Sequence, residues 1–500
     1  MKKNPCITFS FIHYDISRDI HKDRKKIYTA ISDTIDTYPL IIITSELSLS
    51  GYSFKNRNEA LEFSLQANSP EIEQYALLAD RKSAYIGIGF IEYCAATGLL
   101  YNSYRVYGPN GDIACHYRKI QAEESFGTPG DPGQQETFET PWGTVGLLIC
   151  SDSYQALLAR KAVLEGARLL LIPANWPSGT PSPQLIWQAR ARENGVPIAV
   201  CNRTGKLPTI DFRSGKSFLF GPDGGILMEG ASETSRVFTA TLPLDAHGKL
   251  PDAFRAERLA GRTPGLYYPM TYDRRYYNGL ETYCSVRITA LPSAFSGGDA
   301  AIAGMEVRTG KSSPEDKTLL TVLPPLAEKD SADWLNIHGG EPGHAIFSLI
   351  GENGRISAML FKEDGGAHRA VSLERTADAD ITVINAGPLR ICPARLEEAL
   401  QPEFGHAASK LGADVLAISE CRCPVEELPV LQCRTTAQLA VAMAADTALV
   451  CLPPKGHRDW TRVVSGTAPC MAEVELESMI RRKFFQDRMD FRVFWAGSHD

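Results

Sequence analysis

A cysteine stands at the end of an apolar segment, where a nucleophile could be placed. The run Trp142–Ile149 predicts a buried strand, and it stops at Cys150, which is followed by Ser151 and Asp152. A buried strand fixes the backbone, and the turn after it places the thiol beside the next peptide N–H group, that of Ser151. An isolated cysteine is more often an inert core thiol, so the interpretation depends on its partners.

Two charged residues follow other predicted strands. Glu46 comes after the apolar run Leu40–Ile43, and Lys119 comes after the strand Asp112–Tyr117. Taken singly, the glutamate would be a solvated strand end and the lysine a surface residue. Together with Cys150 they supply a base, a nucleophile and a cation that can hold an oxyanion. The combination predicts cysteine-based acyl transfer, in which the lysine also favours the thiolate, without a metal or other cofactor.

A cysteine–histidine pair is the competing arrangement for a cysteine nucleophile. His13, His116 and the histidines of the second half occupy no comparable positions, so the sequence does not favour a papain-like enzyme.

Strands and helices alternate around these positions. Helices are predicted over Asp19–Tyr38, Pro70–Arg81, Gln155–Gly166 and Pro183–Asn194, and strands over Ile7–Ile12, Tyr85–Tyr93, Ala167–Ile172 and Pro197–Cys201. This alternation predicts a layered α/β domain whose strand ends carry the site.

Composition limits the class of protein. A chain of 500 residues exceeds what one hydrophobic core usually supports, so we expect two domains. The net charge of −7 and the scattered basic residues argue against nucleic-acid binding. No apolar run approaches the roughly 18 residues that a membrane span needs, and the start Met1–Lys3 is not followed by an unbroken apolar segment. The 12 cysteines lack metal-type spacing. We therefore expect a cytoplasmic protein with reduced thiols that binds neither nucleic acid nor membrane.

Several blocks in this order resemble the carbon–nitrogen hydrolase (nitrilase) superfamily. They are Ser45–Tyr52, Tyr117–Lys119, Gly146–Asp152 and Arg190–Gly195, together with Leu100–Ser103, Asn202–Gly205 and Gly221–Gly224. The resemblance covers roughly residues 4–275. It implies an αββα sandwich, a fold that forms four layers, and a Glu–Lys–Cys triad that falls on Glu46, Lys119 and Cys150.

The resemblance also implies further site residues. A second glutamate of the family falls on Glu124, ahead of Phe126, with the adjacent Glu123 as the alternative. The predicted substrate-binding and oxyanion residues are Ser151, Tyr52, Asn175 and Trp176.

The residues after the nucleophile favour amide over nitrile hydrolysis. Members that cleave nitriles typically carry Trp-Glu there, whereas amide-cleaving branches carry an aromatic residue and Asp; this chain has Ser151-Asp152. We expect an amidase-type hydrolase that uses water to cleave a small carboxamide or N-carbamoyl compound through a thioester. The alternatives are acyl transfer to another amine, nitrile hydrolysis, and a non-catalytic scaffold or binding protein.

The second half contains four blocks that repeat the first half in order. Asn353–Lys362 resembles Asn110–Lys119, Gly387–Cys392 resembles the segment ending at Cys150, Gly412–Ile418 resembles Gly166–Ile172, and Ala448–Cys451 resembles Ile198–Cys201. Leu323–Leu326 stands where Ser45–Leu47 would be, and Pro393, which has no N–H group, follows Cys392.

We therefore predict a catalytic nitrilase-like domain over residues 1–280 and a degenerate, non-catalytic copy over 281–500. Members of the family pair their sandwiches, so the resemblance implies that two tandem copies make an intramolecular pseudo-dimer. Further self-association through other surfaces stays open.

Overall fold

The computed structural model describes residues 5–271 except 18 and 178–182, separate strands within 284–372, and 380–475 except 387–388, 438, 454–462 and 468–469. The chain divides between Ala260 and Gly261 into two compact units, which are treated separately below. The predicted domain boundary near residue 280 lies outside the described residues.

Two six-stranded mixed sheets form the first unit. The first sheet has the order β12-β1-β2-β3-β4-β5 and the second the order β11-β10-β9-β8-β7-β6. The strands of the first sheet are β1 Cys6–His13, β2 Leu40–Thr44, β3 Tyr85–Cys94, β4 Leu99–Tyr107, β5 Ile113–Arg118 and β12 Arg236–Pro243. Those of the second are β6 Thr137–Phe138, β7 Val145–Leu147, β8 Leu169–Pro173, β9 Ile198–Cys201, β10 Lys216–Phe220 and β11 Ile226–Ala231.

The central strands of each sheet are parallel. In the first sheet β2 runs parallel to both β1 and β3, and in the second β8 runs parallel to both β7 and β9. All other pairs are antiparallel. The carboxyl ends of parallel strands meet at one edge of a sheet, so residues after β2 and residues after β7 and β8 are candidates for a common site.

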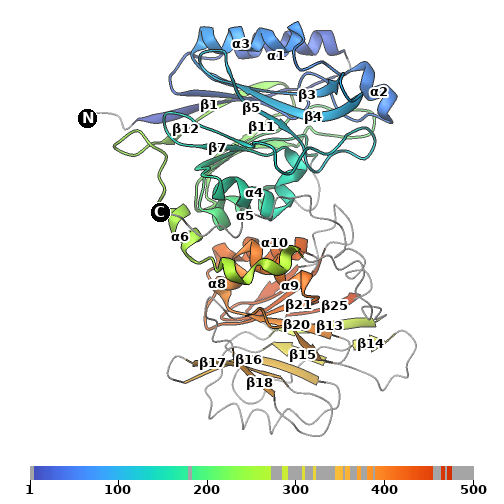
Figure 1. Ribbon diagram of the computed structural model, residues 1–500, viewed down its shortest axis with the longest axis vertical. Coiled ribbons are helices and arrows are strands. Elements are labelled where there is room, and N and C mark those ends of the chain that lie inside the picture. Colours follow the sequence, from blue (N-terminus) through green and yellow to red (C-terminus); the bar gives the residue numbers. More distant parts are fainter. Residues whose placement is uncertain are drawn as a thin grey trace. The chain divides into compact units, whose positions relative to one another are not determined.

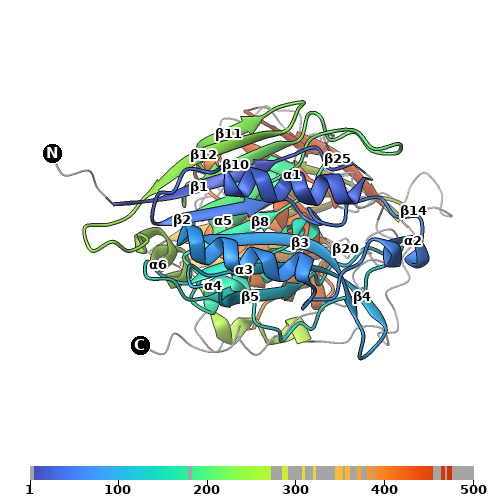
Figure 2. The ribbon, with the colours of Figure 1, turned by 90° about the horizontal axis from the view of Figure 1, so that it is seen from above.

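Helices cover the two sheets on their outer faces (Figures 1 and 2). α1 (Ile20–Ser32) and α3 (Pro70–Lys82) lie over the first sheet, and α4 (Ala156–Leu164) and α5 (Pro183–Asn194) lie over the second. The shorter helices α2 (Arg57–Glu62) and α6 (Ala253–Ala260) and the 3₁₀ turn η1 (Cys150–Tyr154) complete the unit. The layers therefore follow the order helix, sheet, sheet, helix, and the predicted α/β sandwich is confirmed for the first half of the chain.

Apolar side chains fix the helix–sheet layers. Every residue of β2 is buried, as expected for a strand covered on both faces. The core between the helices α1 and α3 and the first sheet includes Ile27, Ile31, Ile72, Leu78, Ile42, Ile86 and Ile88. Each fully buried side chain of this size contributes about 1.5–3 kcal/mol relative to an exposed one.

Helix α1 is shorter than the sequence predicts, because it ends at Ser32 rather than near Tyr38. The Asp33 N–H donates to Thr29 O and closes the last turn, and Thr34 Oγ1 donates to Ile31 O. A β-branched run and Pro39 follow, which disfavour further helix.

The second unit also contains two mixed sheets. One has the order β14-β13-β15-β16-β17-β18, with β25 on the other edge of β13, and the other has the order β19-β20-β21-β22-β23-β24. The first comprises β13 Cys284–Ala290, β14 Val307–Thr309, β15 Leu319–Val322, β16 His344–Glu352, β17 Arg355–Leu360, β18 Arg369–Ser372 and β25 Cys470–Glu475. The second comprises β19 Ile384–Ala386, β20 Leu389–Ala394, β21 Val415–Ser419, β22 Ala440–Ala444, β23 Ala448–Cys451 and β24 Val463–Gly466. Its described helices are α8 Leu396–Ala399, α9 Pro402–Lys410 and α10 Leu428–Arg434.

The strand register corrects one predicted match between the halves. Val145 pairs with Leu169 in the first unit, and Ile391 pairs with Val415 in the second. When Gly412–Ile418 is aligned with Gly166–Ile172, Cys392 therefore corresponds to Gly146, and Leu396 takes the place of Cys150. The match of Cys392 with Cys150 is wrong, because similar apolar runs can be aligned at more than one offset.

The predicted match of Asn353–Lys362 with Asn110–Lys119 also differs from the sheet order, by one hairpin. Residues 353–354 join β16 to β17, which corresponds in sheet order to the connection between β3 and β4. The Asn110–Gly111 turn instead joins β4 to β5. Lys362 follows β17 and is therefore not the counterpart of Lys119; it lies outside the described residues.

Within the described part of the chain, no helix has both the length and the apolar character to cross a membrane.

Candidate active site

Cys150 sits on a sharp turn at the start of η1, with Leu148 and Ile149 between it and the end of β7. Its backbone has φ +46°, in the left-handed region that costs a residue with a side chain about 1–2 kcal/mol. Hydrogen bonds hold the turn: the Asp152 N–H donates to Ile149 O at 2.9 Å, and Ser153 Oγ donates to Cys150 O at 2.6 Å. A strained backbone held in this way places the thiol at the strand's end, as the sequence predicts.

Glu46 lies in the tight turn after β2 and is fully buried. The next residue, Leu47, has φ +49°. Strand β3 passes so close behind this turn that a Cβ atom on Gly89 would lie 2.5 Å from Leu47 N. Asn175 Nδ2 donates to the Glu46 carbonyl oxygen at 2.8 Å, which ties the turn to the end of β8.

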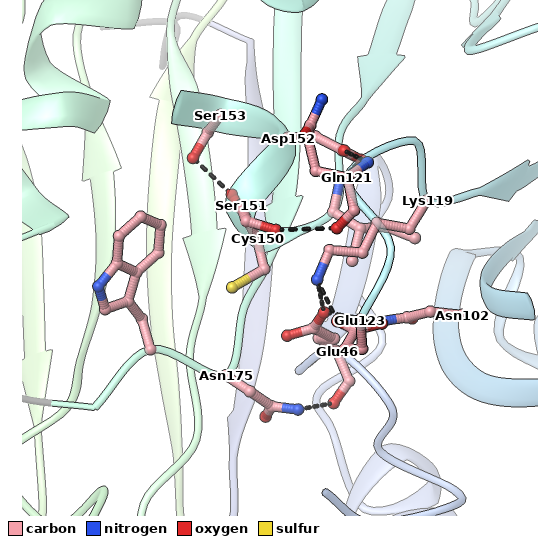
Figure 3. Close-up of polar contacts among 12 residues, drawn as sticks. Glu46, Asn102, Lys119, Gln121, Glu123, Cys150, Ser151, Asp152, Ser153 and Asn175 are labelled. Carbon is pink, nitrogen blue, oxygen red and sulfur yellow. Dashed lines mark hydrogen bonds and ion pairs between the residues drawn. The ribbon is translucent and has the colours of Figure 1, made fainter. Parts of the chain in front are cut away.

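Lys119 extends into the site from the end of β5. Its backbone N–H donates to Asn102 O and its carbonyl accepts from Gly130 N, both at 2.8 Å. Its side chain is 2% exposed, and Nζ donates to Glu46 Oε1 at 2.6 Å and to Glu123 Oε1. The ammonium is therefore held between two carboxylates (Figure 3).

The structure places Glu123, rather than Glu124, beside Lys119. Glu124 is exposed. The assignment of Glu124 as the second glutamate is therefore corrected to Glu123. Both residues lie in a loop without a repeating pattern, so the sequence could not separate them.

Asn102 is a site residue that the sequence reasoning missed. It is fully buried in β4, and its Nδ2 donates to Glu46 Oε1 at 2.8 Å and to the two Glu123 oxygens at 3.0 and 3.1 Å. One amide thus spans both carboxylates. Its position in the block Leu100–Ser103 was the available signal, because a polar residue inside an otherwise buried strand needs a partner.

Burial and neighbouring charges set the protonation of this cluster. Burial raises the pKa of Glu46, although Lys119 opposes the shift. Burial disfavours charge on Lys119, but Glu123 and Glu46 outweigh it and raise its pKa well above the ordinary value. The ammonium therefore stays charged at neutral pH.

The thiol of Cys150 is neutral at rest. Burial raises its pKa well above the ordinary value, Glu46 raises it further, and Lys119 and the Asn175 backbone N–H lower it. Lys119 thus favours the thiolate, as predicted, but burial and Glu46 outweigh its effect on the pKa of Cys150. Glu46 Oε2 has no hydrogen-bond partner among the described residues, which leaves an acceptor for the thiol proton.

Two of the other predicted residues, Asn175 and Tyr52, interact with groups of this cluster. Asn175 is 2% exposed, and its Oδ1 is without a hydrogen-bond partner in the described part of the chain. The Trp176 ring lies 4.6 Å from that of Tyr154, centroid to centroid. Burial, and then the charges of Glu46 and Glu123, raise the pKa of Tyr52 well above its ordinary value, and its ring packs edge-on against Phe212. Ser151 Oγ donates to Gln121 O at 3.2 Å.

Comparison with known proteins relates the first half of the chain to the family that its sequence blocks resemble. A family model described as "Carbon-nitrogen hydrolase" matches residues 14–252. A nitrilase of Pyrococcus abyssi is 31% identical over 208 residues, which cover 41% of this chain and 77% of that protein. A probable nitrilase of Schizosaccharomyces pombe is 28% identical over 232 residues (45% and 85%), and an N-carbamoylputrescine amidase of Arabidopsis thaliana is 30% identical over 200 residues (36% and 66%).

The chain belongs to the carbon–nitrogen hydrolase (nitrilase) superfamily, and residues 14–252 carry the domain that defines it. Its relatives include proteins named as nitrilases and as amidases.

Proposed function

We propose that the first unit hydrolyses the amide or N-carbamoyl group of a small molecule, with Cys150 as the nucleophile. The observation that carries the proposal is the buried arrangement of a neutral thiol, a carboxylate with a free oxygen, and an ammonium held by two carboxylates. Each of the three supplies a group that acyl transfer requires.

The first half-reaction forms a thioester. Glu46 takes the proton of Cys150 while Sγ attacks the carbonyl carbon, and the displaced electron pair resides on the oxygen. Lys119 Nζ and the Ser151 N–H stabilise that oxyanion. Glu46 then returns the proton to the nitrogen, the C–N bond breaks, and ammonia or an amine leaves.

The second half-reaction consumes water. Glu46 takes a proton from water as the water oxygen attacks the thioester carbon. The C–S bond then breaks, Glu46 returns the proton to the leaving sulfur, and a carboxylic or carbamic acid and the thiol of Cys150 result. Glu123 and Asn102 keep Lys119 and Glu46 in position through both halves. An amine in place of water would give the acyl-transfer alternative.

The amide is preferred over the nitrile because Asp152, rather than glutamate, follows the nucleophile at the second position and no tryptophan stands between them. The decisive experiment incubates the full chain with panels of small carboxamides, N-carbamoyl amines and nitriles and measures ammonia and acid release. Cys150→Ala is the matched control. Turnover confined to nitriles, or equal in the control, would contradict the proposal.

We further propose that the second unit is a degenerate, non-catalytic copy of the first. The support is topological: β25-β13-β15-β16-β17-β18 repeats the sequence of antiparallel, parallel, parallel, antiparallel and antiparallel pairs found in β12-β1-β2-β3-β4-β5. The sheet of β19 to β24 repeats the pair directions of β6 to β11 in the same way. With Leu396 at the position of Cys150, this copy would lack a nucleophile and would act as the packing partner in a pseudo-dimer.

A further inference from the structure

Asp152 holds the segments that carry two different site residues. Its carboxylate is fully buried and accepts three hydrogen bonds: Oδ1 from Gln121 N at 2.7 Å, and Oδ2 from Tyr117 OH at 3.0 Å and from Ile149 N at 3.2 Å. Tyr117 and Gln121 flank Lys119, two positions before it and two after it. The Asp152 carboxylate therefore accepts hydrogen bonds from residues on both sides of Lys119.

The same carboxylate also fixes the cysteine turn. Ile149 directly precedes Cys150, and its N–H is bonded to Asp152 Oδ2, while the Asp152 N–H is bonded back to Ile149 O. These two bonds close the turn in which Cys150 adopts φ +46°. Ser151 Oγ adds a bond to Gln121 O, so the peptide of Gln121 is held on both its N–H and its carbonyl.

We propose that Asp152 is a positioning residue that sets the placement of Lys119 relative to Cys150. The inference rests on the proposed function of these two residues and deepens it. Lys119 extends from the first sheet and Cys150 from the second, so a group bonded to both segments fixes the offset between oxyanion partner and nucleophile. Asn102 and Glu123 hold the tip of the lysine, whereas Asp152 holds its backbone.

Asp152→Asn tests this with little change in volume. An amide can accept from Gln121 N through its oxygen, but its NH₂ group then faces the Ile149 N–H, donor against donor. We expect kcat on the amide substrate to fall by about 10²-fold, as for a displacement of roughly 1 Å, with KM changed by less than about threefold. Tyr117→Phe removes one of the three bonds and should give a smaller loss of kcat.

Glu136→Gln is the matched control. Glu136 is a fully buried acidic residue near Asp152, and its side chain lies 3.2 Å from Lys161 Nζ of α4. It should retain kcat within about threefold.

A second readout does not need a substrate. The rate at which iodoacetamide alkylates Cys150 is followed against pH by peptide mass spectrometry in the folded full chain. Among the described residues, Glu46 and Lys119 are the titratable groups that shift the pKa of this thiol most, and Tyr52 also interacts with it electrostatically. The alkylation midpoint is the pH at which the rate reaches half its maximum. Displacing Lys119 removes stabilisation of the thiolate, so this midpoint should move to higher pH in Asp152→Asn. Removal of a negative charge alone would move it to lower pH.

These outcomes separate the two proposals. A raised alkylation midpoint in Asp152→Asn supports positioning even if no amide is ever turned over. A midpoint that is unchanged or lowered, or a kcat loss matched by Glu136→Gln, would overturn it, whatever the substrate.

Discussion

At the residue scale, the proposed reaction depends on how the thiol of Cys150 loses its proton. If Cys150 is the nucleophile, as proposed, its buried thiol with a raised pKa has to be deprotonated in each turnover, and Glu46 is the proposed base. Glu46→Gln keeps the shape of the side chain but cannot accept the proton. We expect no acyl-enzyme by intact mass after mixing with substrate, and a trapped thioester formed at the wild-type rate would refute glutamate as the base.

The two cysteines Cys150 and Cys392 give a sharp comparison. Cys150→Ala should lower turnover by several orders of magnitude while the protein stays folded. Cys392→Ala removes a buried thiol in β20 and should cost only about 1 kcal/mol of stability, with turnover nearly unchanged. Ammonia release and thermal unfolding of both variants measure this difference, and retained activity in both would place the nucleophile elsewhere.

The pKa of Glu136 predicts a pH dependence of stability. Burial raises that pKa to about 8, and Lys161 opposes the shift only in part. Between the unfolded value of 4.5 and about 8 the native state therefore binds more protons than the unfolded state, and the free energy of unfolding should fall as the pH rises through this window.

Glu136→Gln should remove that contribution, so its unfolding free energy should decline less than that of the wild type between pH 6 and 8. Urea unfolding at both pH values measures the slopes. Equal slopes would show that the Glu136 carboxyl is not buried with a raised pKa.

At the element scale, the close approach of β3 to the Glu46 turn constrains the position of Glu46. In Gly89→Ala the new Cβ would lie 2.5 Å from Leu47 N, so the backbone of the turn has to move. We expect kcat to fall by about 10²-fold, with a smaller change in KM, because the base and not the binding residues is displaced. The half-buried glycine Gly98 provides the control substitution Gly98→Ala. Its Cβ would meet nothing within 4 Å and its φ is +68°, so an alanine there strains the backbone at the β3–β4 turn without pressing on the Glu46 turn. Equal kcat in both variants would contradict this account.

Hydrophobic periodicity predicts the strands and therefore the strand ends that carry Glu46, Lys119 and Cys150. It does not predict loops, where Glu123 and Glu124 are adjacent and equally polar, and only the three-dimensional path distinguishes them. Asn102 was missed because its partners come from two distant segments. The register of β20 shows a further limit, since a run of apolar residues defines a strand better than it defines an alignment.

At the scale of the whole molecule, the prediction concerns the second unit. If it is the packing partner of the first, the isolated segment 1–280 should be poorly soluble or newly dimeric, because an apolar helical face would become exposed. Light scattering on this segment and on the full chain measures the difference. A truncated protein that stayed monomeric and fully active would assign residues 281–500 another role.

The proposed catalytic groups come from both sheets of the first unit: Glu46 and Lys119 follow strands of one, and Cys150 and Asn175 follow strands of the other. Apart from the connecting segments of the chain, side-chain packing and buried hydrogen bonds hold the two sheets against each other, among them Asn175 Nδ2 to Glu46 O and Tyr117 OH to Asp152 Oδ2. The rate of the proposed reaction therefore depends on the position of one sheet relative to the other. Heating or a core mutation that shifts one sheet by about 1 Å against the other should slow the proposed reaction by about 10²-fold while both sheets remain intact.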